Sequence, residues 1–68
     1  MYGERLRKIR KERKVPQKKL AELLGISVRG YQFYDTEDAE PKIPMLIALA
    51  DFYDVSIDYL VGRTDTPK

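Results

Sequence analysis

Residues 17–34, QKKLAELLGISVRGYQFY, constrain the fold of this chain more than any other stretch. Apolar residues recur at helical spacing over 17–24, and Gly25 follows as a residue that accepts a left-handed backbone and ends a helix. Ser27 then stands where a helix N-cap belongs and predicts a second helix over 28–36. Two helices joined by a short turn with a glycine form either a hairpin that only packs or a helix-turn-helix. Evidence from the other parts of the sequence is needed to distinguish these two alternatives.

The remainder of the chain adds three short helices and shows no strand pattern. Apolar spacing predicts them over residues 2–14, 45–53 and 57–61. The segment 35–44 between the third and fourth helices is polar and carries two prolines, so we expect a loop there. Gly62 closes the last helix, and residues 63–68 are expected to form a flexible tail. The predicted fold is therefore all-α and compact, with five helices in one domain over 1–62.

The composition disfavours several kinds of functional site. The chain has no Cys and no His, which removes disulfides, thiolate metal sites and the commonest general base. The carboxylates fall on predicted loops and helix surfaces, so we expect no enzyme, no metal and no cofactor. No apolar run is long enough to span a membrane, and no signal peptide is present. We therefore expect a cytoplasmic protein that has no membrane partner.

The charge is distributed unevenly along the chain. Residues 1–19 hold nine Lys or Arg against Glu4 and Glu12, which gives +7, whereas residues 20–68 carry −5. Such asymmetry favours a nucleic-acid partner, although a solvated helix face would produce the same pattern.

Several short motifs occur together along the chain. They are LRKIR (6–10), Q-x-x-LA-x-LLGIS (17–27), Y-x-x-YD (31–35), EP (40–41) and LIALADFYDVSIDYLVGRTD (46–65). In order and spacing they resemble the lambda-repressor-like helix-turn-helix family, the Cro/cI or XRE type of bacterial and phage regulators. The resemblance covers nearly the whole chain and implies a five-helix DNA-binding domain with the helix-turn-helix at helices two and three. It also implies double-stranded DNA as the partner, usually bound by a homodimer on a near-palindromic operator.

In this geometry the second helix of the motif enters the major groove. The positions of this chain that would meet base edges there are Val28, Arg29, Gln32 and Phe33. Arg29 can bond guanine O6 and N7 together, and Gln32 offers the donor and acceptor that adenine requires. Val28 and Phe33 can only touch a thymine methyl group. Alternatively, Arg29 contacts a phosphate or only solvent, and the two apolar side chains are partly buried.

Three further residues are candidates for contacts to DNA phosphates. The resemblance implies that Gln17 bonds a phosphate at the positive end of its helix, with Lys18 nearby. Lys42 is the cation available in the segment after the second helix of the motif. The family also often pairs an arginine with an acid where this chain has Arg10 and Asp35, so we expect a partly buried ion pair. Two unrelated surface charges are the alternative.

The loop after the motif departs from the family pattern. Members usually have a glycine and then a basic residue near positions 37 and 38, whereas this chain has Glu37 and Asp38. Acids near phosphates weaken the electrostatic part of DNA binding. Three explanations are open: the loop swings clear of DNA, dimerisation compensates for low affinity, or the acidic loop 35–40 binds a protein.

The leading hypothesis is a sequence-specific regulator of bacterial DNA, in the cytoplasm with the nucleoid, that represses by excluding polymerase. We expect any dimer to use this domain, and the candidate interface residues are Phe52, Tyr59 and Val61. The alternative is a protein-interaction or antitoxin-like module that keeps the fold with weak or no DNA binding. The sequence leaves open whether these residues form a whole protein or part of a longer repressor.

Overall fold

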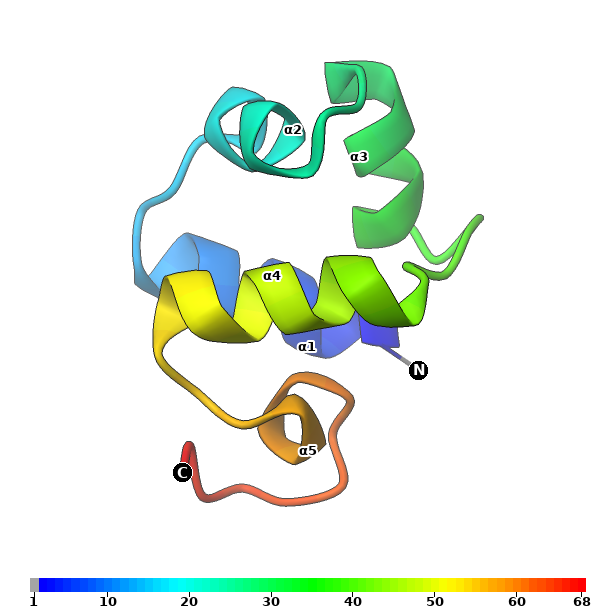
Figure 1. Cartoon of the computed structure of the whole chain (residues 1–68). Coiled ribbons are helices and arrows are strands. Elements are labelled where there is room, and N and C mark those ends of the chain that lie inside the picture. The colour runs from blue at the N-terminus through cyan, green and yellow to red at the C-terminus, as the bar shows by residue number, and fades with distance from the viewer. Residues whose placement is uncertain (1) are drawn as a thin grey trace.

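The structure is a computed structural model that describes residues 2–68, and it contains five helices (Figure 1). They are α1 (Tyr2–Glu12), α2 (Gln17–Leu24), α3 (Val28–Asp35), α4 (Ile43–Tyr53) and α5 (Ile57–Leu60). No strand occurs among the described residues, and the prediction of an all-α, five-helix fold is confirmed.

Four of the predicted helix boundaries are wrong by one or two residues, and one of them is the end of α3, at Asp35 rather than at residue 36. The first helix ends at Glu12 rather than at residue 14, because Lys14 has a left-handed backbone with φ 56°. α4 begins two residues before its predicted start, with Pro44 inside its first turn. Proline is well tolerated there because the N–H it lacks would have no partner inside the helix. α5 ends one residue early, at Leu60.

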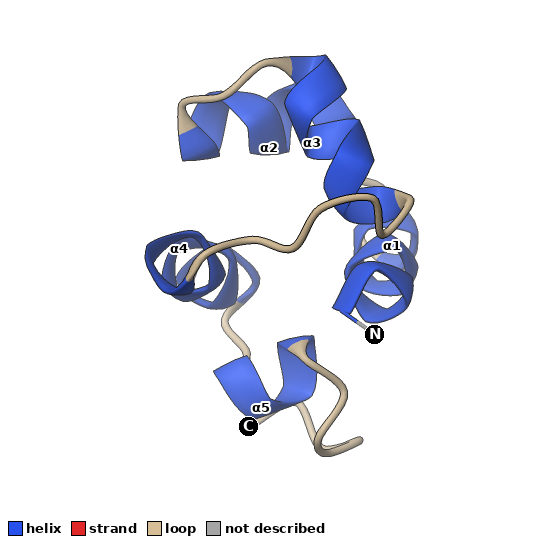
Figure 2. Ribbon diagram, turned by 90° about the vertical axis from the view of Figure 1, so that its right-hand side faces the viewer, coloured by secondary structure: helices blue, strands red, loops and turns tan. Residues whose placement is uncertain are grey.

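The helices are arranged so that the two helices of the motif share one end of the molecule. Figures 1 and 2 show α2 and α3 at one end, α1 and α4 in the middle and α5 at the opposite end. α3 packs on α1 and α2, and no other helix of the described chain covers its outer side. One face of α3 is therefore free to meet a partner.

One apolar core holds the helices together. Its residues come from all five helices and include the fully buried side chains Leu6, Ile9, Leu20, Tyr31, Leu49 and Leu60. Burying a side chain of this size removes it from water at a gain of about 1.5–3 kcal/mol. With no disulfide available, this packing and the polar contacts described below hold α3 in place.

The turn of the motif is fixed by local caps, as the sequence predicts. Gly25 has φ 70°, and its N–H bonds back to α2. The Ser27 hydroxyl accepts a hydrogen bond of 2.9 Å from the Gly30 N–H in the first turn of α3. Each bond satisfies a helix end that would otherwise lack a partner, so the angle between α2 and α3 is set by residues 25–27.

Residues 63–68, expected to form a flexible tail, lie against the domain in the structure. The Arg5 guanidinium donates to the backbone oxygens of Tyr59 and Thr64 at 3.0 and 3.1 Å, and it pairs with Asp65 at 3.0 Å. The Ser56 N–H also donates to the Pro67 oxygen at 2.8 Å. These contacts would restrain the tail. Its flexibility remains a prediction.

Candidate nucleic-acid interface

The four residues predicted to contact bases lie together on the outer side of α3. Val28, Arg29, Gln32 and Phe33 are all exposed, with 38% of Val28 and 41% of Phe33 accessible. The opposite side of the same helix carries buried Tyr31 and Asp35. Val28 and Phe33 are therefore partly buried, but each keeps apolar surface that is open to a partner.

Arg29 lies above the ring of Phe33, with its guanidinium carbon 5.6 Å from the ring centroid. A cation–π contact of this kind restrains the side chain without consuming its hydrogen-bond donors. In the described part of the chain Arg29 forms no ion pair. Its planar group of donors thus remains available for a base or a phosphate.

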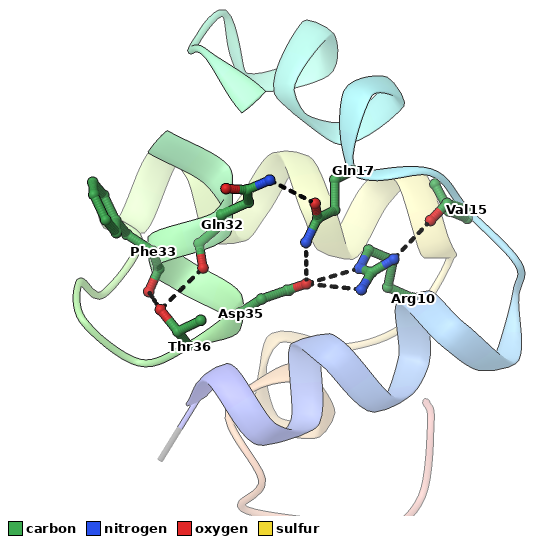
Figure 3. Close-up of polar contacts among 7 residues, drawn as sticks. All are labelled: Arg10, Val15, Gln17, Gln32, Phe33, Asp35 and Thr36. Carbon is green, nitrogen blue, oxygen red and sulfur yellow. Dashed lines mark hydrogen bonds and ion pairs between the residues drawn. The ribbon is translucent and has the colours of Figure 1, made fainter. Parts of the chain in front are cut away.

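Arg10 and Asp35 form an ion pair between α1 and α3 (Figure 3). Arg10 Nε donates to Asp35 Oδ2 at 3.0 Å, and Arg10 Nη2 lies 2.9 Å from the same oxygen as an ion pair. A third guanidinium nitrogen, Nη1, donates to the Val15 oxygen at 3.3 Å. The arginine side chain is 14% exposed and the aspartate 4%. The pair therefore ties α3 to α1 and to the linker before α2.

Gln17, expected at a phosphate, lies between the ion pair and the outer face of α3. Its Nε2 donates to Asp35 Oδ2 at 3.0 Å, and its Oε1 accepts from Gln32 Nε2 at 3.2 Å. Figure 3 shows Gln17 between Gln32 and Asp35, joined to each by a dashed line. No sequence pattern predicts the contact between Gln17 and Gln32, because the contact depends on how α2 and α3 meet in space.

The two lysines predicted to contact phosphate occupy helix starts. Lys18 is exposed in the first turn of α2, and Lys42 is the exposed N-cap residue of α4. Free backbone N–H groups and the helix dipole make such positions favourable for anions. Neither lysine forms an ion pair with another described residue.

Two buried tyrosines, Tyr31 and Tyr53, lie close enough to the ion pair to interact with its charges. Burial, and then the negative charge of Asp35, raises the pKa of the Tyr31 phenol above its ordinary value. Burial also raises the pKa of Tyr53 to about 12, although the charge of Arg10 opposes the rise. Both phenols therefore stay protonated under ordinary conditions.

The acidic loop has a left-handed backbone at position 37, near the place where the family usually has glycine. Glu37 has φ 66°, a left-handed conformation that glycine adopts most easily. Asp38 is exposed and accepts a hydrogen bond of 2.7 Å from the Thr36 hydroxyl. The loop also lies close to α1, because a Cβ on buried Gly3 would overlap the Glu37 side chain and the Tyr34 oxygen.

The residues predicted for a dimer interface do not form one exposed patch. Phe52 is 38% exposed, whereas Tyr59 and Val61 are partly buried, and Arg5 covers the Tyr59 ring at 4.5 Å. The more exposed apolar residues, Ile43 at 63% and Ile47 at 46%, lie on α4 and were missed. The sequence feature that could have identified them is that α4 is apolar on nearly every face. The core covers only one face of such a helix, so some of its apolar residues must be exposed.

Residues 2–68 offer neither a membrane-spanning helix nor a metal-binding cluster. No described helix is both long enough and apolar enough to cross a membrane. The same residues contain no cluster of three or more acids that could hold a metal ion.

Comparison with known proteins identifies the family. A family model described as helix-turn-helix matches residues 6–60, which is most of the chain. The chain belongs to the XRE-type helix-turn-helix family. This is a family of DNA-binding transcriptional regulators and not of enzymes, so the resemblance drawn from the sequence is confirmed.

Relatives of the XRE-type family match nearly the whole chain. The HTH-type transcriptional regulator YobD of Bacillus subtilis (strain 168) is 45% identical over 67 residues, covering 98% of this chain and 60% of the relative. The cryptic phage CTXphi transcriptional repressor RstR of Vibrio cholerae serotype O1 is 36% identical over 65 residues, covering 96% and 58%. The crystal structure of a transcriptional regulator from Listeria innocua superposes with a TM-score of 0.87 at 35% identity, covering 91% of this chain and 58% of that one. The chain thus spans about three fifths of the length of these XRE-type relatives.

Proposed function

We propose that this chain is a sequence-specific DNA-binding repressor that places α3 in the major groove. The observation that carries the proposal is the exposed face of α3, where Arg29 and Gln32 stand beside two apolar side chains on a helix fixed by a buried ion pair. A rigid helix with base-reading donors and acceptors at its start is what direct readout requires. The bacterial cytoplasm with its nucleoid is the setting that such a regulator needs.

Each residue has a chemical role in this proposal. Arg29 bonds guanine O6 and N7, Gln32 bonds adenine, and Val28 and Phe33 pack against thymine methyl groups. Phosphate contacts fix the register of the domain on the duplex, and the residues proposed for them are Gln17, Lys18 and Lys42.

Two observations support a dimeric repressor. RstR, a relative with 36% identity, is named as a phage transcriptional repressor. Apolar surface is exposed on α4, at Ile43, Ile47 and Phe52, where a second copy could pack. A dimer on a near-palindromic operator would place its two α3 helices about 34–36 Å apart, one turn of DNA. We retain Phe52, Tyr59 and Val61 as candidate interface residues and add Ile43 and Ile47.

The proposal is tested by the specificity of the Arg29→Ala variant. Binding to duplexes that carry each single base substitution should show that the variant has lost discrimination at one base pair. The loss of binding free energy on the preferred duplex should be about 1–3 kcal/mol. Arg63→Ala is the matched control, because it removes an arginine whose side chain is 78% exposed at the opposite end of the domain. An Arg29→Ala variant that discriminates all bases like the parent would overturn the base-reading role.

A protein-interaction or antitoxin-like role is the second candidate, and the acidic loop 35–40 favours it. Asp38 and Glu40 are exposed beside α3, where phosphates would otherwise approach. A basic protein surface would complement this loop better than DNA does. Partner binding that is lost in Asp38→Lys but unchanged in Arg29→Ala and Gln17→Ala would favour this role over DNA binding.

A further inference from the structure

Hydrogen-bonded side chains run from the interior of the domain to the outer face of α3. Arg10 and the Gln17 Nε2 both donate to one oxygen of Asp35, whose side chain is 4% exposed. The Gln17 Oε1 accepts in turn from the Nε2 of exposed Gln32 at 3.2 Å. Figure 3 shows that this series connects α1, the start of α2 and the candidate base-contacting face of α3.

The direction of these bonds is set at the buried end. A carboxylate that is ion-paired with arginine can only accept hydrogen bonds. The Gln17 carboxamide must therefore turn its nitrogen toward Asp35, because the opposite orientation would place two oxygens against each other. Its oxygen then faces α3 and can only accept, so the Gln32 carboxamide must present nitrogen to it. The charge of Asp35 thus fixes the orientation of an amide two side chains away.

We propose that Gln17 and Asp35 are positioning residues that orient the Gln32 carboxamide for adenine. This inference rests on the proposed function and deepens it. With one N–H bonded to Gln17, Gln32 keeps one N–H and its Oε1 free, and these match the N7 acceptor and N6 donor of adenine. A carboxamide free to flip would present donor and acceptor in either order, so its preference for one base would be weaker. Holding the side chain in one orientation before binding also lowers the entropy lost on contact.

The test is selection from a random duplex library, compared between the parent and five variants, two of which are controls. Gln32→Ala identifies the base pair that Gln32 contacts as the one position where preference disappears. At that position Gln17→Ala should lower the preference for adenine about tenfold, the scale of one bidentate contact. Lys18→Ala is the control, because loss of a phosphate contact weakens binding to all sequences without changing preference.

A second pair of variants separates orientation from stability. Asp35→Asn should lower the same preference, because its amide can donate to Gln17 and allow the series to reverse. Arg10→Lys weakens the ion pair but leaves an accepting carboxylate, so it should retain the preference while lowering the unfolding midpoint. Circular dichroism at the selection temperature shows which variants are folded, and preference is compared among those.

The outcomes distinguish this proposal from the proposed function. A parent motif with adenine at the Gln32 position, relaxed in Gln17→Ala and in Asp35→Asn, supports the positioning role. If both variants keep the parent's preference and only bind more weakly, the positioning role is wrong and Gln17 is a phosphate contact. A folded parent that selects no motif overturns the proposed function, and with it the assignment of adenine.

Discussion

Two nitrogens of Arg10 contact a single oxygen of Asp35: Nε donates a hydrogen bond at 3.0 Å, and Nη2 lies 2.9 Å away as an ion pair. The second carboxylate oxygen, Oδ1, is buried and has no hydrogen-bond partner within the described residues. Because Gln17 also donates to Oδ2, two hydrogen bonds and one ion-pair contact from α1 and α2 converge on one atom of α3. The position of α3 on the domain, and hence of its outer face, therefore depends strongly on one carboxylate.

Replacing this carboxylate should destabilise the domain severely. Asp35→Ala leaves the Arg10 guanidinium, with a side chain only 14% exposed, without its charge partner. Removing one member of a buried pair costs about 3–5 kcal/mol of the free energy of unfolding, which urea denaturation measures. Asp58→Asn is the control, since its pairing with Arg63 at 3.9 Å is exposed and should contribute less than about 1 kcal/mol. Equal losses in the two variants would show that the Arg10–Asp35 pair behaves as a surface pair.

Gly3 should not tolerate a side chain, although it lies in a helix. Alanine favours a helix interior by up to about 1 kcal/mol over glycine, but here its Cβ would overlap the Glu37 side chain and the Tyr34 oxygen. We expect Gly3→Ala to lower the free energy of unfolding by about 1–3 kcal/mol, as overpacking does. Lys8→Ala, an exposed change in the same helix, should have little effect. A stabilised Gly3→Ala variant would mean that the acidic loop does not pack on α1.

The N-cap of α3, Ser27, should contribute to the stability of the domain. Ser27→Ala removes the acceptor of the 2.9 Å bond from the Gly30 N–H and should cost about 1 kcal/mol. Ser27→Asp keeps an acceptor at the same position and should restore most of the stability. Thermal unfolding of the three proteins gives the comparison. If Ser27→Ala and Ser27→Asp unfolded at the same temperature, the cap would have no energetic role.

The buried tyrosines should make the domain less stable at alkaline pH. Burial raises the pKa of both phenols, Tyr31 and Tyr53, above the ordinary value of 10.0. The pKa of Tyr53 rises to about 12. Well below pH 10 both phenols are protonated in the folded and unfolded chains, so there they do not affect the pH dependence. Above pH 10 the unfolded chain releases protons that the folded chain keeps, so stability falls until the folded pKa is passed.

Urea denaturation from neutral pH upward measures this fall. Tyr31→Phe removes one of the two groups while keeping the ring, so its free energy of unfolding should decline less steeply above pH 10. Near neutral pH the variant should differ little from the parent, because the Tyr31 hydroxyl has no hydrogen-bond partner in the described chain. A decline as steep as that of the parent would show that Tyr31 does not carry the effect.

The elements best predicted from the sequence are those defined by local signals. The end of α2 and the start of α3 agree with prediction because Gly25 and Ser27 act within one turn of chain. The start of α4 was placed too late because a proline that ends a loop and a proline in a first helical turn look alike in sequence. Periodicity alone does not separate these two cases.

The candidate site was only partly accessible to sequence reasoning. The spacing of α3 suffices to place Arg29 and Gln32 on one face, and the family pattern suggested Arg10 and Asp35 as a pair. The bond from Gln32 to Gln17 and the close approach of Gly3 to Glu37 depend on side-chain rotamers and helix packing. No local pattern encodes contacts of this kind, and they were not predicted.

The most direct test of DNA recognition by α3 is selection from a random duplex library with the purified parent chain. It should be run at about 150 mM salt, because salt sets the strength of phosphate contacts. We predict a two-fold symmetric motif, with a guanine in each half-site whose preference disappears in Arg29→Ala. The absence of any enriched motif, for a chain shown to be folded by circular dichroism, would contradict the account and direct attention to the acidic loop.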